Sequence, residues 1–168
     1  MESVTKKNLK QAFAGESQAN RRYLAYAKKA AEEGFENVAR LFKAVAATET
    51  IHANILFEAM DGVKSTLENV EQALEGEVEE ATGLYPMFMD QAKRDVDNEA
   101  LTSFFYAGEA EKTHADLYEK AVAALKQGKD VDLGDIFICS VCGYTVVGKP
   151  PEKCYTCDKG KEAFELFE

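Results

Sequence analysis

The only two histidines of the chain each follow a glutamate by three positions. They stand in TETIHANIL (48–56) and AEKTHADLY (110–118), as Glu49–His52 and Glu111–His114. Residues three apart lie on one face of a helix, so each pair can direct a carboxylate and an imidazole at one point. A single pair of this kind is commonly a surface pair in a charged helix. Two pairs that use every histidine favour a metal site.

The elements that must position these pairs are helices. Apolar residues at helical spacing predict helices over about 3–32, 36–60, 77–93 and 98–127, with Pro86 as a kink or start point in the third. Turns near 32–35 and 95–98 join them into two hairpins. Residues equidistant from a turn face each other in an antiparallel hairpin, which sets Glu16 opposite Glu49 and Glu80 opposite Glu111. Each hairpin thus offers one glutamate opposite a Glu-x-x-His pair.

The two halves of the helical region look like an internal duplication. An offset of 62 positions aligns the Glu-x-x-His pairs, and it also aligns Phe42 with Phe104 and Ala46 with Gly108. Four carboxylates inside an apolar bundle cost several kcal/mol each, roughly, unless cations compensate them. Two divalent cations would do so, and carboxylate with imidazole suits iron or manganese. The alternative is a bundle with solvated acidic faces. The predicted ligands of a dinuclear site are Glu16, Glu49, His52, Glu80, Glu111 and His114.

Four helices with two short turns predict a mainly α protein with a ferritin-like four-helix bundle. A long middle crossover is expected over about 63–76, and the bundle is expected to occupy residues 1–134. The remaining residues, 135–168, are aromatic, β-prone and rich in turn residues. They predict a small β-rich C-terminal domain that needs a metal to staple it.

All four cysteines lie in this C-terminal segment, in two Cys-x-x-Cys pairs: Cys139, Cys142, Cys154 and Cys157. Two such loops form a tetrahedral site of four thiolates, for which iron and zinc are both suitable. Zinc would only staple the fold, whereas iron would carry one electron. The spacing leaves both open.

Charge and hydropathy exclude several classes of partner. The chain has 168 residues and a formal net charge of −10, which disfavours nucleic acid and anionic lipid. No segment reaches the roughly 18 apolar residues of a membrane span. The N-terminal MESVTKKNLK is polar and unlike a signal peptide, so the expected compartment is the cytoplasm.

With both metal motifs in view, the chain resembles the rubrerythrin family. AFAGES (12–17), ETIH (49–52), LYP (84–86) and EAEKTHADLY (109–118) are similar to its di-iron domain. ICSVCGYTVVGKPPEKC (138–154) is similar to its rubredoxin-like tail.

The resemblance implies a non-haem iron peroxidase that reduces hydrogen peroxide to water in oxidative-stress defence. It implies two iron ions in the dinuclear site, bridged by Glu49 and Glu111, and one iron ion in the four-cysteine site. Zinc is the alternative occupant of either. It implies electrons from reduced nicotinamide, relayed by a separate reductase to the cysteine-bound iron. It also implies a homodimer or larger homo-oligomer in which the tail of one subunit approaches the di-iron site of another.

Two departures from the family pattern stand out. The family usually has a second glutamate of the third helix two residues before Tyr-Pro, where this chain has Gly83. Water or a neighbour such as Glu79 would then replace that carboxylate, which in the family exchanges with a histidine as the oxidation state changes. In the tail, Ser140 and Tyr155 replace the usual prolines, and Asp158 stands where glycine is common.

Two tyrosines are candidates for hydrogen bonds to the ligands. Tyr23 lies two helical turns after Glu16, and Tyr85 follows the Gly83 position. Packing in the core is the alternative for both.

Two other functions compete with the peroxidase. One is a ferroxidase or iron-handling protein that oxidises ferrous iron with oxygen. The other is a zinc-stapled scaffold without enzymatic activity.

Overall fold

The computed structural model of the protein describes residues 3–167. They form two compact units, one ending at Lys64 and one beginning at Ser65. We call these the hairpin unit and the C-terminal unit. No helix in the described part of the chain combines the length and apolar character needed to cross a membrane.

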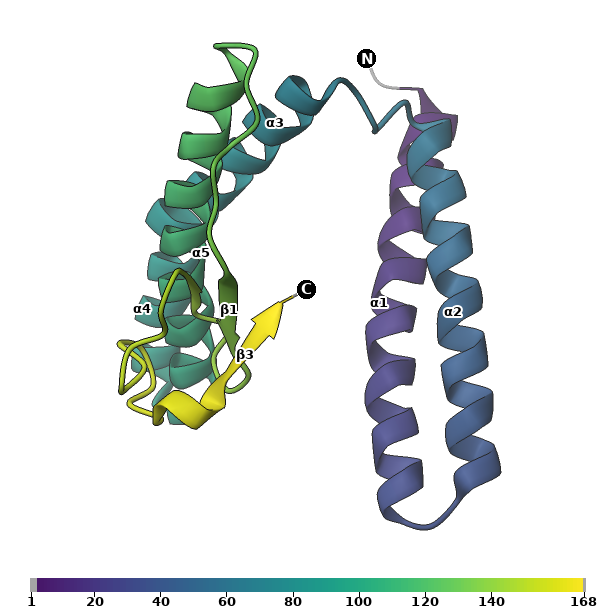
Figure 1. The fold of residues 1–168 in the computed structure, drawn as a ribbon. Helices are drawn as coiled ribbons and strands as arrows, with labels where there is room; N and C mark the ends of the chain where they lie inside the picture. The colour runs from purple at the N-terminus through teal and green to yellow at the C-terminus, as the bar shows by residue number, and fades with distance from the viewer. Residues whose placement is uncertain (1–2, 168) are drawn as a thin grey trace. The chain divides into compact units, whose positions relative to one another are not determined.

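The hairpin unit consists of two antiparallel helices, α1 (Val4–Glu32) and α2 (Glu36–Ala59) (Figure 1). Ser3 caps α1 by accepting a hydrogen bond from the Lys6 amide. The residues that α2 buries are Ala39, Ala46 and Ala53, one every seven positions. Alanine at this spacing forms a narrow seam that lets the two helix backbones approach closely.

A buried asparagine fixes how α1 and α2 align. The Asn20 amide nitrogen donates to the Ala46 carbonyl at 2.7 Å and to the Thr50 hydroxyl at 2.9 Å. Asn20 is only 8% exposed, so slippage of the hairpin would leave its amide without partners inside the seam. One polar residue in an apolar seam commonly specifies the register in this way.

The C-terminal unit starts with a helix where the sequence predicted a connection. Ser65 and Glu68 form a reciprocal capping box, so α3 runs from Thr66 to Glu79. The expected long crossover over 63–76 is therefore wrong: only residues 60–65 separate α2 from α3. The predicted helix over 77–93 is likewise the second part of a longer helical run.

That helical run contains an irregular turn. After α3 comes a π-helix, η1 (Glu80–Leu84), followed by α4 (Tyr85–Asp95), whose first turn holds Pro86. The expected role of Pro86 as a start point is confirmed. Asp97 then caps α5 (Asn98–Leu125) by accepting from the Ala100 amide.

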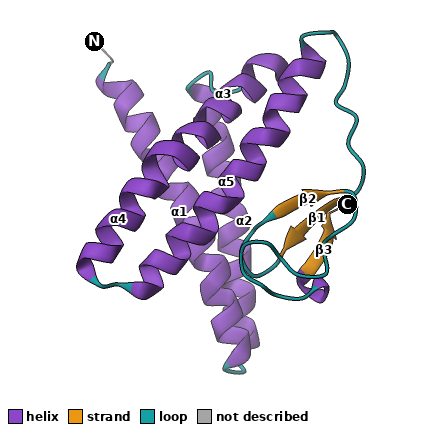
Figure 2. Cartoon of the chain, turned by 90° about the vertical axis from the view of Figure 1, so that its left-hand side faces the viewer, coloured by secondary structure: helices purple, strands orange, loops and turns teal. Residues whose placement is uncertain are grey.

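The rest of the C-terminal unit is a three-stranded antiparallel sheet, which we call the sheet domain (residues 136–167). Its strands β1 (Ile136–Cys139), β2 (Thr145–Val147) and β3 (Phe164–Phe167) have the order β2-β1-β3. A short 3₁₀-helix, η2 (Lys161–Ala163), precedes β3. The sheet lies beside α5, which β2 contacts (Figure 2). The predicted mainly α protein with a small β-rich end is confirmed.

Candidate metal centres

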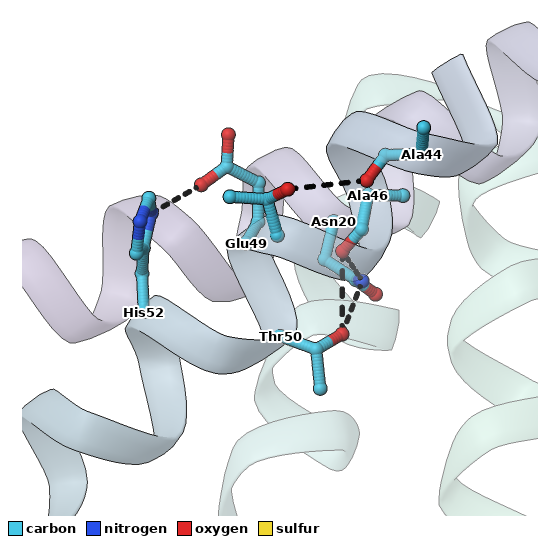
Figure 3. A network of polar contacts seen from close by, with 7 residues as sticks. Asn20, Ala44, Ala46, Glu49, Thr50 and His52 are labelled. Carbon is cyan, nitrogen blue, oxygen red and sulfur yellow. Dashed lines mark hydrogen bonds and ion pairs between the residues drawn. The ribbon is translucent and has the colours of Figure 1, made fainter. Parts of the chain in front are cut away.

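The first cluster of metal-binding side chains lies within the hairpin unit, and we call it the N-terminal triad: Glu16 from α1, with Glu49 and His52 from α2. Each residue offers a ligand atom within 4.8 Å of the others. His52 Nδ1 lies 3.0 Å from Glu49 Oε2. Figure 3 marks this contact. The His52 side chain is 51% exposed, whereas that of Glu49 is 14% exposed. The predicted opposition of Glu16 and Glu49 thus brings both to one point.

The second cluster, the C-terminal triad, consists of Glu77 from α3 with Glu111 and His114 from α5. His114 Nδ1 lies 2.8 Å from Glu111 Oε2 and 3.4 Å from Glu77 Oε2. All three side chains are at most 32% exposed. Each unit therefore gathers two carboxylates and one imidazole.

Sequence reasoning missed Glu77 and named Glu80 instead. Glu80 is partly buried at the start of the π-helix, outside the group formed by Glu77, Glu111 and His114. Glu16 precedes Glu49 by 33 positions, whereas Glu77 precedes Glu111 by 34. The helical run that carries Glu77 also contains the π-turn, which holds one residue more than a regular helical turn.

The position of Glu77 also bears on the departure at Gly83. Glu77 and Glu80 are three apart, so this helical run carries two partly buried carboxylates despite the glycine. Glu79, the expected substitute, is exposed. Glu77 is therefore an additional carboxylate beside Glu111 and His114.

The electrostatics of the C-terminal triad favour a bound cation. Burial first, and then the neighbouring Glu111, raise the pKa of Glu77 from 4.5 to about 6. Glu77 Oε2 is fully buried and has no hydrogen-bond partner among residues 3–167. A buried carboxylate oxygen without a donor, directed at a second carboxylate and an imidazole nitrogen, fits a divalent metal ion.

The four cysteines form a third cluster, in the sheet domain. All four sulfur atoms lie within 4.8 Å of one another, with Cys139 Sγ 3.7 Å from Cys157 Sγ and Cys142 Sγ 3.5 Å from Cys154 Sγ. Cys139, Cys142 and Cys154 are at most 8% exposed, and with Phe164 they make up the buried core of this domain. The geometry matches a tetrahedral site with four sulfur ligands.

Two similar turns shape this four-cysteine cluster. The residue after the second cysteine of each pair has a left-handed backbone, with φ of 79° at Gly143 and 57° at Asp158. Aspartate tolerates this conformation, so its replacement of glycine leaves the turn intact. Burial raises the pKa of Cys142, whereas at Cys139 backbone amides of Val141 and Cys142 outweigh burial and lower the pKa. Metal binding must therefore displace protons from thiols such as Cys142.

The two candidate tyrosines lie in different surroundings. Tyr23 packs in an aromatic group with Tyr26 and Phe42. Burial first, then Glu111 and other carboxylates of the C-terminal unit, raise the pKa of Tyr85, which places it beside the C-terminal triad. Hydrogen bonding of either hydroxyl to a ligand stays a prediction.

Comparison with known proteins agrees with both kinds of centre. The profile of the rubrerythrin family matches residues 7–122, and that of the rubrerythrin rubredoxin-like domain matches residues 137–165. Rubrerythrin-2 of Clostridium acetobutylicum is 36% identical, over 98% of this chain and 97% of its own. Nigerythrin of Nitratidesulfovibrio vulgaris is 33% identical, over 97% of this chain and 86% of its own.

Solved structures of a rubrerythrin relative also match this chain. One described as the fully reduced, all-ferrous state of nigerythrin has a TM-score of 0.56 and 32% identity, covering 99% of this chain and 88% of its own. The expected di-iron site and rubredoxin-like four-cysteine site agree with these matches. On its sequence from end to end, on its fold and on its clustered ligands, the chain belongs to the rubrerythrin family.

Proposed function

We propose that this protein is a peroxidase that reduces hydrogen peroxide to water at a dinuclear iron site, in defence against oxidative stress. The observation that carries the proposal is the presence, in one chain, of two carboxylate–histidine triads and a four-cysteine cluster. The proposed ligands are the six predicted residues, Glu16, Glu49, His52, Glu80, Glu111 and His114, together with Glu77.

The chemistry needs two electrons and two protons for each peroxide, which yields two molecules of water. A pair of bound irons would supply the two electrons. The residues of the chain have to hold that pair and provide hydrogen bonds at the same place. Tyr85 suits the second task because it carries a hydroxyl donor among the carboxylates of the C-terminal unit, Glu111 included.

The four-cysteine cluster is the proposed entry point for electrons, with iron as its occupant. Electrons would come from reduced nicotinamide through a separate reductase protein. Within the C-terminal unit the sheet domain already reaches a residue of the C-terminal triad, because Thr145 Oγ1 lies 3.2 Å from His114 Nε2. This contact supports a route inside one chain, in addition to the route between subunits expected from the family.

We assign the bundle to residues 1–134 and the electron-accepting domain to residues 135–168. A homodimer or larger homo-oligomer is part of the proposal, and family resemblance supports it. Sedimentation equilibrium of the iron-loaded protein measures the assembly directly. A monomer at micromolar concentration would contradict this part.

The test starts with iron-loaded protein reduced under anaerobic conditions. One equivalent of hydrogen peroxide is added, and the visible absorption of the oxidised, cysteine-bound iron is followed by stopped flow. We expect the absorption to return faster with peroxide than with oxygen. Faster return with oxygen would instead favour the ferroxidase, and absence of the absorption would favour a zinc staple.

Two variants localise the chemistry. Glu111→Ala is expected to remove dinuclear iron and peroxide turnover, because it deletes the half-buried carboxylate beside His114 Nδ1. Glu109→Ala, two residues earlier on α5 and paired with Lys112, is the matched control. Unchanged iron content in Glu111→Ala would contradict the proposed site.

A further inference from the structure

The two ring nitrogens of His114 have different partners. Nδ1 faces the carboxylates of Glu111 and Glu77, at 2.8 and 3.4 Å. Nε2 faces away from them, 3.2 Å from the hydroxyl oxygen of Thr145 in strand β2. With a metal ion on Nδ1, the proton of the neutral ring must sit on Nε2, where it needs an acceptor.

Thr145 is oriented to be that acceptor. Its hydroxyl donates to the Gly143 carbonyl at 3.2 Å, which uses its only hydrogen. The lone pairs of Oγ1 are then available to the Nε2–H group of His114. The direction of both hydrogen bonds is therefore set by the Gly143 carbonyl, a backbone group that cannot reverse its role.

The surroundings of the two histidines differ. A cavity of about 450 Å³ lies beside His114, and its lining is mostly apolar, with Val70, Leu117 and Ile136 among the side chains. The counterpart His52 differs, because its side chain is 51% exposed and its Nε2 has no protein partner within the described part of the chain. Within the described residues, Thr145 thus gives His114 a protein partner for Nε2 that His52 lacks.

We propose that Thr145 is a positioning residue for the C-terminal triad, holding His114 with Nδ1 directed at the metal. The proposal rests on the proposed function in one respect, that His114 is a metal ligand. Gly143 directly follows Cys142 in the four-cysteine cluster. One hydrogen bond joins the Gly143 carbonyl to Thr145, and a second joins Thr145 to His114, so two hydrogen bonds connect the four-cysteine cluster to the triad. The occupied four-cysteine site thereby helps to set the metal affinity of the triad.

The test uses the full-length protein, with zinc as a diamagnetic probe in every site. Thr145→Val removes the hydroxyl in a strand that continues with two valines, and Thr145→Ser retains it. Thr102→Val, on α5, is the matched control, because within residues 3–167 its hydroxyl bonds only the Asn98 carbonyl. Zinc affinity is measured by competition with a chelator, and the ring N–H protons of the two histidines are followed by ¹⁵N-edited NMR.

We expect Thr145→Val to weaken zinc binding in one step of the titration by roughly 10- to 100-fold. The Nε2–H proton of His114 should then exchange quickly with water, while Thr145→Ser and Thr102→Val behave as the unchanged protein. Should the valine disturb the sheet, Thr145→Ala gives the same comparison. Unchanged zinc affinity and an unchanged His114 N–H signal in the variants without the hydroxyl would overturn the proposal.

These readouts are independent of peroxide chemistry. A protein that binds zinc as expected but fails to reduce peroxide when loaded with iron would refute the proposed function and leave the role of Thr145 standing. A working peroxidase whose Thr145→Val variant keeps its zinc affinity would do the reverse.

Discussion

Replacement of Glu77 by glutamine separates the metal-binding role of this carboxylate from its effect on stability. In the metal-free protein, burial and Glu111 raise the pKa of Glu77 from 4.5 to about 6. The protonated form is therefore favoured by folding, and this stabilisation is complete below pH 4.5 and lost as the pH rises through 6. At pH 7 the ionised carboxylate costs about 2 kcal/mol relative to a neutral group.

Glu77→Gln keeps the shape of the side chain but cannot ionise. The metal-free variant should be more stable than the unchanged protein by up to about 2 kcal/mol at pH 7, and equal to it near pH 4.5. With metal present the order reverses, because the variant lacks one charged ligand of the C-terminal triad. Urea unfolding followed by far-UV circular dichroism at both pH values gives the first result, and iron content gives the second.

The control for this experiment is Glu79→Gln. Glu79 lies two residues further along and is exposed, so neither its stability nor its iron content should change. The reasoning fails if metal-free Glu77→Gln is no more stable than the unchanged protein at pH 7. It fails equally if Glu77→Gln retains the full complement of iron.

Three further substitutions test the fold. Val96 has a left-handed φ of 57° and is 78% exposed. Val96→Gly should therefore raise the free energy of unfolding, measured by thermal unfolding, by about 1 kcal/mol. The control Val78→Gly, within α3, should lower it by a similar amount. Asn20→Ala removes two bonds across the hairpin and should cost about 1–3 kcal/mol, against little change for exposed Asn54→Ala. Cys142→Ser should lose the metal of the four-cysteine site and unfold the sheet domain, while the helical circular dichroism persists. Retained metal would contradict a site of four sulfur ligands.

The sequence was sufficient for the residues that follow regular helical geometry. Glu-x-x-His pairs are recognisable by their spacing, and Glu16 follows from its distance to the turn because α1 and α2 are uninterrupted. The four cysteines were equally evident, because their close approach follows from the two Cys-x-x-Cys loops. In each case a regular local geometry, the α-helix or the Cys-x-x-Cys loop, relates position in the sequence to position in space.

The errors arose where that relation changes. Counting back from the second turn placed Glu80 opposite Glu111, whereas the carboxylate grouped with Glu111 is Glu77, three positions earlier. The π-turn at Glu80–Leu84, which the count did not include, accounts for one of these three positions. A helix before residue 77 was also missed, although Ser65-Thr66-Leu67-Glu68 has the spacing of a capping box.

The contact between Thr145 and His114 could not be read from the sequence, because it depends on how the sheet packs on α5. That packing also connects the stability of one centre with that of the other. Three of the four buried core residues of the sheet domain are cysteines of the four-cysteine cluster, so a bound metal would hold much of this core together. A metal bound there would therefore help to hold strand β2, and with it Thr145, in place. Loading of the four-cysteine site should precede tight binding at the C-terminal triad, since the acceptor for His114 is fixed only in the folded sheet.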